Sequence, residues 1–521
     1  MPSSTPNRIL VSGVGLLALL GTLGHAAPTP EQVAAATAAA AAYPPAPGMP
    51  PVKFNPERPI PTKGSVRDIE SLTTAPEGMV MTRRNNFYRR TADGQTNLPG
   101  TDLYRWSFTG HFSNYDEAHT GDFKQVPDLL TLNNGQPVRD AATWTNVRRK
   151  EVVELLETHM YGKVPANVPK LEWTATKTTN ADGSVTTVAE GKYVNADGTP
   201  FVNPQAAAPA AGGRGAASAA TPAVAVAATN GAAAPATAGA SAAPGAAGAA
   251  GRGGRGGPGA GGSPAPVNGL RITYTVPANA TGAVPLIQGG NAQAVHALGF
   301  GTVNFQGSAP NVSTGRPDDW GAIRKNAWAV SVSLDYLETD RTVDARQIAL
   351  TGHSIGGKQA LLRAVMDERI GLVFASCSGE GGASLMRRDF GETIDDIGQL
   401  SPGNYCQNFL KYLGNWQAMP VDAHMLIALM APRPAFVTGG TGDLWSDPVG
   451  VFWAAKFASP VYKLLGKKAI DIDAPPEPNT FVGGDLLFYN HIGGHITTPE
   501  ESAKYLELAK QYFKVKPFAA K

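Results

Sequence analysis

The order of apolar and polar positions along the chain predicts a large region in which strands and helices alternate. From about residue 284 onward, short apolar runs typical of buried strands are separated by longer segments with apolar residues at helical spacing. The predicted strands cover residues 284–288, 302–305, 347–351, 372–376 and 434–438, and the predicted helices cover 320–338, 356–367 and a last segment that opens at Thr498. Such alternation indicates a mostly parallel sheet with helices on both faces, an αβα sandwich of the α/β class.

Two further elements precede this region. Residues 145–161 place Val, Leu and Met at helical spacing, and Gly162 follows as a helix stop. Residues 171–194 alternate polar and apolar positions around an Asn-Ala-Asp-Gly turn, which predicts a β-hairpin. The last helix has a capping box, because Glu501 lies three residues after Thr498.

One biased segment interrupts the chain. Residues 205–266 are almost entirely Ala, Gly, Pro, Ser and Thr, so they cannot bury enough apolar area to offset the entropy of ordering. Strand-like sequence resumes at residues 270–276, so we interpret the segment as a flexible insertion between two strands of one domain. Its GRGGRGG end is compatible with binding nucleic acid or anionic glycan, but a solvated spacer is the favoured interpretation.

Composition sets the size of the folded part. The chain has 521 residues with 60 Gly and 42 Pro, and much of the Gly lies in the insertion. What remains suits one α/β domain of roughly 300–400 residues. We assign this domain to residues 111–515 and expect residues 27–110, rich in Ala and Pro, to form an extended N-terminal segment.

The N-terminus predicts export. Arg8 precedes an apolar run at residues 9–23, and the sequence Gly24-His25-Ala26 then offers small residues at the positions that a signal peptidase requires. The run is shorter than the roughly 20 residues that a membrane span needs, which disfavours an anchor. We therefore expect a signal peptide at residues 1–26 and a periplasmic or secreted protein.

Net charge and cysteine content limit the binding partners, disulfides and metal sites that we expect. The net charge of +2 gives no strong bias toward nucleic acid or acidic membranes, and we expect a monomer that binds neither. Cys377 and Cys406 are compatible equally with a disulfide and with free buried thiols. Neither has a second Cys or His at metal-ligand spacing, so we predict no metal site and no cofactor.

A nucleophile motif lies at the junction of a predicted strand and helix. Residues 352–356 read GHSIG, a G-x-S-x-G sequence that follows the strand QIALT and opens the helix GGKQALLRAVMDE. This context is that of a nucleophile elbow, in which the glycines permit a sharp turn and a close helix. We predict Ser354 as the nucleophile of an α/β-hydrolase, at a helix N-terminus that favours negative charge. A simple Gly-Ser turn is the weaker alternative.

A serine nucleophile needs a base, and in this fold a histidine follows the acid in the chain. His495 lies in a Gly-Gly-His loop before the last helix and is the predicted base. His491 is the rival, with a structural role as the default. His424 lies in the apolar stretch HMLIALM and is expected to be buried, whereas the side chain of His353 is expected to point away from that of the serine.

The acid is expected after a strand between the serine and the histidine. Asp443 follows the strand PAFVTGG and would fix the imidazole tautomer and stabilise the imidazolium. Asp447 belongs to Ser-Asp-Pro, a turn or helix-cap sequence. Glu380, after the previous strand, is the rival acid.

Several stretches in the same order resemble the glucuronoyl esterases, carbohydrate esterase family 15. They are SLDYLETDRTVDARQIALTGHSIGGKQALLRAVMDER, GEGGASLMRRDFGET, MPVDAHMLIALMAPRP, GDLWSDP and GGH. The similarity runs from about residue 114 to 513 without the insertion. It implies a secreted enzyme that cleaves, through an acyl-enzyme, the ester between glucuronic acid on xylan and lignin alcohols. The resemblance also matches Ser354 to the nucleophile and His495 to the base.

The resemblance carries three further residues onto this sequence. Lys358 matches the lysine that holds sugar hydroxyls, Trp445 resembles the tryptophan that lines the sugar site, and Glu392 falls near a polar position that contacts the sugar. Without the family match, residues of these types are usually solvated or packing residues.

Two departures from the family pattern bear on function. The family usually has Arg after the serine, where it helps to stabilise the oxyanion; here Ile355 leaves its backbone N–H, with a second donor expected near residues 288–290. The commoner position of the family acid aligns with Cys377, whereas some members place it one strand later, which matches Asp443. Because one oxyanion donor is typically worth about 100- to 1,000-fold in rate, the absent Arg keeps a second function open, that of an esterase for another ester such as an acetylated sugar.

A non-catalytic carbohydrate-binding protein is a third possible function, disfavoured by the intact serine, acid and histidine.

Overall fold

The computed structural model describes residues 120–202, 268–412 and 416–517, residue 117, and four short strands before it. These strands form two antiparallel pairs: β1 (Met79–Met81) with β2 (Phe87–Arg89), and β3 (Tyr104–Trp106) with β4 (Phe112–Asn114). The predicted signal peptide, most of the N-terminal segment and the 205–266 insertion lie outside the described residues.

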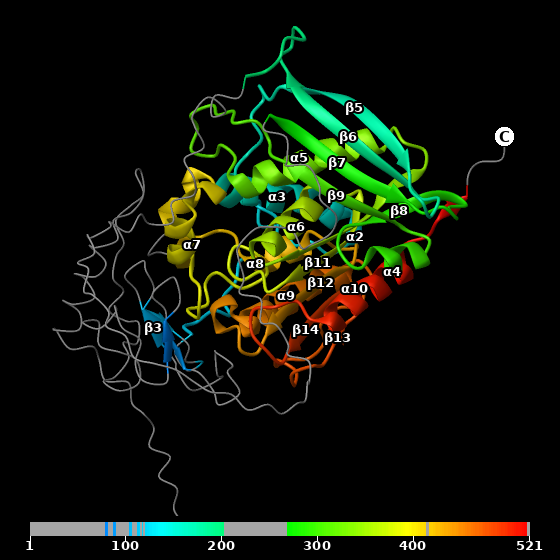
Figure 1. The fold of residues 1–521 in the computed structure, drawn as a ribbon. Helices are drawn as coiled ribbons and strands as arrows, with labels where there is room; N and C mark the ends of the chain where they lie inside the picture. Colours follow the sequence, from blue (N-terminus) through cyan, green and yellow to red (C-terminus); the bar gives the residue numbers. More distant parts are fainter. Residues whose placement is uncertain are drawn as a thin grey trace, which may run out of the picture.

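A single large sheet runs through the described part of the domain (Figure 1). Its strand order is β13-β14-β12-β11-β10-β8-β9-β7-β6-β5, and β15 also pairs with β8. Neighbours from β14 to β9 are parallel, whereas β7, β6 and β5 extend one edge in antiparallel fashion. The bounds are β5 Lys170–Thr179, β6 Val185–Val194, β7 Gly269–Val276, β8 Gly282–Ile287, β9 Gly301–Gly307, β10 Val343–His353, β11 Ile370–Ser376, β12 Ala435–Gly440, β13 Val482–Gly483, β14 Leu486–His491 and β15 Lys516–Pro517.

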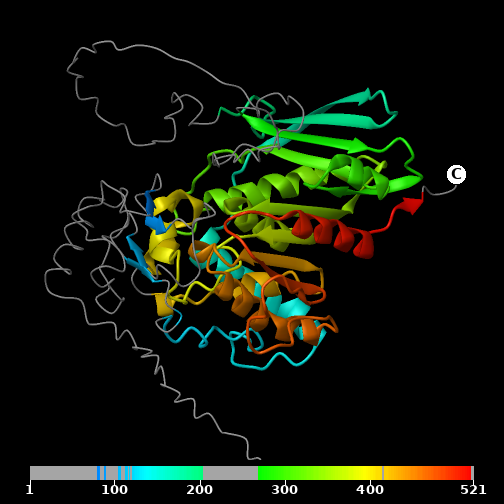
Figure 2. The same cartoon turned by 60° about the horizontal axis from the view of Figure 1, so that its bottom comes forward.

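Helices cover both faces of the sheet, as predicted (Figures 1 and 2). Successive residues of the central strands alternate between two cores: Leu350 and Val373 belong to one, and Ala349 and Phe374 to the other. The first core also contains α5, α6, α8 and α9, and the second contains α4 and α10. Their bounds are α4 Ala292–Ala297, α5 Ala322–Leu337, α6 Ile355–Met366, α8 Ala423–Ala428, α9 Pro448–Leu464 and α10 Pro499–Tyr512, and the peripheral α7 spans Ile394–Leu400. The predicted three-layer α/β-hydrolase architecture is therefore confirmed.

The helix predicted at residues 145–161 begins earlier than expected. It comprises α2 (Ala141–Thr143), two π-helical segments (Trp144–Arg148 and Glu157–Tyr161) and α3 (Arg149–Leu156) between them. Asp140 caps its start, because the carboxylate accepts from the Thr143 N–H at 2.7 Å. The helix ends at Gly162, where φ is +86° and a Cβ would lie 2.3 Å from the Asp319 carbonyl oxygen.

The predicted hairpin is the pair β5 and β6. Its turn ends at Gly183, which has φ +79° and donates its N–H to the Asn180 carbonyl. Strand β6 then pairs with β7 from Val185↔Val276 to Lys192↔Gly269. The strands on either side of the low-complexity segment are therefore hydrogen-bonded neighbours.

Helix α9 was absent from the sequence prediction. Ten of its 17 residues are buried, and an almost uniformly apolar segment lacks the amphipathic period by which a helix is recognised. Asp447 caps it by accepting from the Gly450 N–H at 2.9 Å, which confirms the helix-cap interpretation of Ser-Asp-Pro. No helix in the described ranges combines the length and apolar character that a membrane crossing requires.

Candidate active site

The predicted nucleophile lies at a sharp turn between β10 and α6. Ser354 has φ +58° and ψ −126°, a conformation that side-chain-bearing residues rarely adopt, and its N–H donates to the Ser376 carbonyl at 3.0 Å. A Cβ at Gly352 would lie 2.0 Å from the Gly356 carbonyl oxygen, so only glycine fits there. A Cβ at Gly356 would meet open space, whereas one at Gly357 would lie 2.9 Å from Ser378. The tight packing expected of the motif's second glycine thus falls one residue later.

The predicted base and acid are in direct contact. Nδ1 of His495 lies 2.7 Å from Oδ2 of Asp443, and the hydroxyl of Ser446 lies 3.3 Å from the same nitrogen. Because the carboxylate is an acceptor, Nδ1 carries the proton and Nε2 keeps its lone pair. Burial acts to lower the pKa of His495, but its hydrogen bond to Asp443 and that residue's charge outweigh burial and raise it.

A histidine that the sequence analysis set aside joins this pair. The ring of His353, next to the nucleophile, lies 4.4 Å from the ring of His495, centroid to centroid. This contact brings the end of β10 to the base. Burial, with a smaller contribution from His495, lowers the pKa of His353 to about 4, so the ring is neutral near pH 7. The only sign in the sequence that His353 lies at the site is its position next to Ser354.

The three residues named from the family resemblance also come together. Nζ of Lys358 lies 2.9 Å from Oε2 of Glu392, and both side chains are mostly buried. The Glu392 N–H donates to the Trp445 carbonyl at 2.7 Å. Glu392 raises the pKa of His495 and Lys358 lowers it, although both contributions are smaller than those of burial and Asp443. The ion pair is therefore close enough to the base to act on its charge.

The rival acids and bases are all buried. Glu380 is fully buried, neither carboxylate oxygen has a hydrogen-bond partner among the described residues, and burial followed by the charge of Glu392 raises its pKa well above the usual range. Asp447 pairs with Arg388 at 2.9 Å. His424 is buried, as expected, and contacts a backbone carbonyl at 2.8 Å. His491 uses both ring nitrogens, which leaves neither for a serine.

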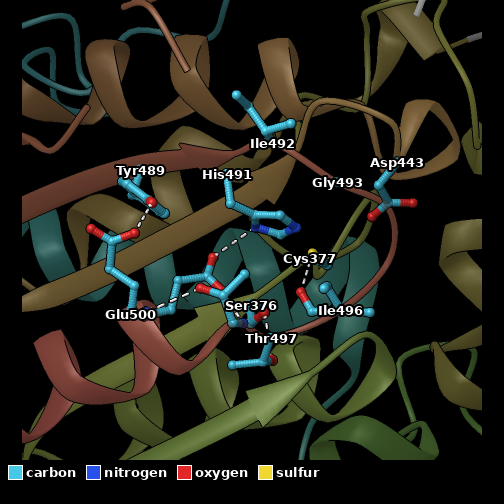
Figure 3. Close-up of polar contacts among 12 residues, drawn as sticks. Ser376, Cys377, Asp443, Tyr489, His491, Ile492, Gly493, Ile496, Thr497 and Glu500 are labelled. Atoms are coloured by element: carbon cyan, nitrogen blue, oxygen red, sulfur yellow. Dashed lines mark hydrogen bonds and ion pairs between the residues drawn. The ribbon is translucent and has the colours of Figure 1, made fainter. Parts of the chain in front are cut away.

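Cys377 lies beside the acid and the base. Its backbone has φ +45°, and its Sγ lies 3.4 Å from the Ile496 carbonyl oxygen (Figure 3). The potential ligand atoms of Cys377, Asp443 and His495 all lie within 4.8 Å of one another, a grouping that sequence spacing did not reveal. Burial, then the charges of Asp443 and Glu501, raise the pKa of the thiol well above its ordinary value. At neutral pH the group is therefore a protonated thiol.

Both cysteines are free and buried, so of the two alternatives the structure contains the unpaired thiols. The Sγ of Cys406 lies 3.7 Å from the Thr158 carbonyl oxygen.

The expected oxyanion donors lie at the start of α6 and in the loop after β8. Ile355 is the first residue of α6, so its N–H has no acceptor within the helix. Its side chain is 44% exposed. The second expected donor region follows β8, where Gly289 and Gly290 have φ +84° and +78°. A Cβ at Gly289 would lie 2.4 Å from the side chain of Thr351, so this loop packs against the strand that leads to the nucleophile.

Similar sequences identify the family of this chain. A family model described as fungal glucuronyl esterase matches residues 313–466. The carbohydrate esterase MZ0003, from an unknown prokaryotic organism, is 30% identical over 401 residues, which cover 77% of this chain and 92% of that protein. The 4-O-methyl-glucuronoyl methylesterase 1 of Wolfiporia cocos is 32% identical over 148 residues, 27% of this chain and 36% of its own length.

Solved structures agree with these matches. A promiscuous esterase of carbohydrate esterase family 15 from a marine bacterial metagenome has a TM-score of 0.58 at 25% identity, over 77% of this chain and 100% of that chain. A glucuronoyl esterase of the same family from Teredinibacter turnerae has a TM-score of 0.58 at 26% identity, over 82% of this chain and 96% of that chain. This chain therefore belongs to carbohydrate esterase family 15, the family of the glucuronoyl esterases.

Proposed function

We propose that this protein is an exported serine esterase that hydrolyses esters of glucuronic acid, of the kind that link plant cell-wall xylan to lignin alcohols. The observation that carries the proposal is the Asp443–His495 pair, 2.7 Å apart, beside the Ser354 elbow in a member of family 15. The 4-O-methyl-glucuronoyl methylesterases among its relatives support the acyl side of the substrate.

The first half of the reaction forms an acyl-enzyme. Nε2 of His495 takes the hydroxyl proton of Ser354 while Oγ attacks the ester carbonyl carbon. The tetrahedral intermediate places a negative charge on the former carbonyl oxygen, which the Ile355 N–H at the helix N-terminus stabilises. His495 then returns the proton to the leaving alcohol as the bond between carbon and alcohol oxygen breaks.

The second half regenerates the enzyme. A water molecule gives a proton to His495 as its oxygen attacks the acyl carbon, and collapse of the second intermediate releases the glucuronic acid and reprotonates Ser354. Asp443 accepts a hydrogen bond from the Nδ1–H of His495 throughout the reaction and stabilises the imidazolium in both steps. The Asp443 side chain is 3% exposed and that of His495 is 38% exposed, so the carboxylate is sheltered from water while the imidazole is partly solvated.

Lys358, Glu392 and Trp445 supply the sugar-binding side of the proposal. The ammonium of Lys358 retains donors beyond the one directed at Glu392, and these suit sugar hydroxyls. Because the ion pair is mostly buried, Lys358 is held in one orientation before substrate arrives.

We also propose that residues 111–515 form one esterase domain with residues 205–266 as an insertion, secreted after cleavage at about residue 26 and active as a monomer. The direct pairing of β6 with β7 supports the insertion. The serine, acid and histidine all come from one chain, which supports a sufficient monomer.

A second candidate is an esterase for a different ester, such as an acetylated sugar. Ile355 favours it, because the family's usual Arg is absent and the residue present is apolar and 44% exposed. One similar family member is described as promiscuous.

Hydrolysis of benzyl glucuronate, measured against hydrolysis of an acetylated sugar, tests the proposal. We expect preference for the glucuronate ester and loss of both activities in Ser354→Ala. Preference for the acetyl ester would support the second candidate. If a fluorophosphonate fails to label the wild type at Ser354, the protein is not a serine esterase and a carbohydrate-binding role is favoured.

A further inference from the structure

His491 precedes the predicted base by four residues and is fully committed to two hydrogen bonds. Its Nδ1 lies 3.1 Å from Oε1 of Glu501, and its Nε2 lies 3.0 Å from the carbonyl oxygen of Gly494. The His491 and Glu501 side chains are 2% and 0% exposed.

Both neighbours of the ring are acceptors. The Gly494 carbonyl accepts, so Nε2 carries a proton. The other carboxylate oxygen of Glu501 accepts from the Thr498 N–H at 2.6 Å, in the capping box of α10, and a helix N-terminus favours the ionised carboxylate. Each ring nitrogen therefore faces an acceptor, an arrangement that suits a doubly protonated imidazolium.

The bond to Gly494 acts on the loop that bears the base. Gly494 directly precedes His495, and this loop is also held by the Gly442 N–H, which donates to the Gly493 carbonyl at 2.7 Å. The ring fits here because position 440 is glycine, where a Cβ would lie 2.6 Å from Nε2 of His491 and 2.5 Å from the Gly494 oxygen. The ends of β12 and β14 thus meet at the ring of His491, and the loop carrying the base is fixed beside the loop carrying the acid.

We propose that His491 is a positioning residue which, as an imidazolium paired with Glu501, clamps the Gly494 carbonyl and so holds His495 against Asp443. The inference rests on the proposed esterase function. It gives this chain two histidines that must be in opposite protonation states for catalysis: neutral His495 and charged His491.

The charges around the ring favour its protonated form. Glu501 faces it from α10 and Asp443 from the loop after β12, whereas neutral His353 lies toward it from β10, and His495 and the protonated Cys377 are nearby. Burial lowers the pKa of His491, but the Glu501 hydrogen bond and charge, the Gly494 carbonyl and Asp443 together raise it above its ordinary value.

The direction of the pH effect follows. A histidine with a raised folded pKa contributes its stabilisation fully below about pH 6.5 and loses it as pH rises through the folded value. A neutral ring keeps one proton, and the carboxylate competes for it more strongly than the Gly494 carbonyl. Activity therefore falls as pH rises above the optimum, because the hydrogen bond from His491 to the Gly494 carbonyl is lost. Below the optimum, activity falls because His495 becomes protonated.

Glu501→Gln separates the charge from the hydrogen bonds. The amide oxygen keeps the cap on Thr498 and the amide N–H₂ donates to Nδ1, so a neutral His491 retains its Nε2 proton for Gly494. We expect kcat at the pH optimum to stay within about threefold of wild type, and the alkaline fall of about 10- to 100-fold to disappear. The matched control is Glu500→Gln, whose carboxylate accepts instead from the Tyr489 hydroxyl at 2.6 Å and leaves the profile unchanged.

An unmoved alkaline limb in Glu501→Gln, or an equal shift in Glu500→Gln, would overturn the proposal. A second measurement is independent of activity: ¹⁵N NMR of histidine-labelled full-length protein, with the resonance assigned by His491→Gln. Two protonated ring nitrogens at pH 7, titrating above about pH 6.5, are expected; a neutral ring refutes the clamp even if Glu501→Gln fails to fold. An inactive wild type with a charged His491 would instead refute only the proposed function.

Discussion

The assignment of the acid leads to the most quantitative expectation, because the structure contrasts two carboxylates. Asp443→Asn replaces the charged partner of His495 with a neutral amide of the same shape. The atoms Nδ1 and Oδ2 are 2.7 Å apart, which places the centres of charge of an imidazolium and a carboxylate roughly 4 Å from one another. At an effective dielectric constant of about 20, that separation stabilises the imidazolium by about 4 kcal/mol.

This energy corresponds to about 10³-fold in kcat. The amide also presents a donor to Nδ1, which favours the wrong tautomer, and the same substitution in a serine protease triad costs about 10⁴-fold. The side chain of His495 is 38% exposed, so solvent screening favours the lower part of this range. We expect kcat on benzyl glucuronate to fall about 10³- to 10⁴-fold, with a melting temperature close to that of wild type.

Glu380→Gln is the matched control. Its carboxyl group has a raised pKa because it is buried, so the amide replaces a neutral acid, and a change in kcat below about tenfold is expected. The acid limb of kcat/KM should also move to lower pH in Asp443→Asn, because Asp443 raises the pKa of His495. A larger loss in Glu380→Gln than in Asp443→Asn would show that the acid comes from the preceding strand.

Three further outcomes are expected. Gly352→Ala should destabilise the fold by more than about 1–3 kcal/mol in thermal unfolding, because its Cβ would lie 2.0 Å from a backbone oxygen. Gly356→Ala should melt like wild type, and equal melting temperatures of the two variants would contradict the geometry. Ile355→Arg should raise kcat on benzyl glucuronate about tenfold without lowering the melting temperature, because Ile355 is 44% exposed and an arginine head group would remain solvated. No gain in kcat in a variant that melts like wild type would favour a different ester as the substrate. Deletion of residues 206–264 should leave melting temperature and activity nearly unchanged, because the flanking strands pair directly; a large drop in melting temperature would show that the segment packs on the domain.

The local sequence determined much of this protein. Apolar runs and helical spacing located the central strands and α5, α6 and α10, because each pattern reflects burial of one face or two. The elbow at Ser354 was readable because a strand, a tight turn and a helix follow one another without a gap. Helix α9 was missed because it is apolar on most sides, and the early start of the helix at Asp140 because its cap lies outside the apolar repeat.

The tertiary structure decided which side chains meet. Asp443, Glu380 and Cys377 all follow strands of the predicted sheet, and their order in sequence does not say which of them reaches His495. Parallel strands bring their carboxyl ends to one edge, and the strand order there placed Asp443 against the imidazole and Cys377 beside it as a protonated thiol. It placed Glu380 in a buried site where no described residue hydrogen-bonds its carboxyl group. The charge on His491 likewise depends on Glu501 of α10 and on a loop carbonyl, which only the folded chain brings to opposite sides of one ring.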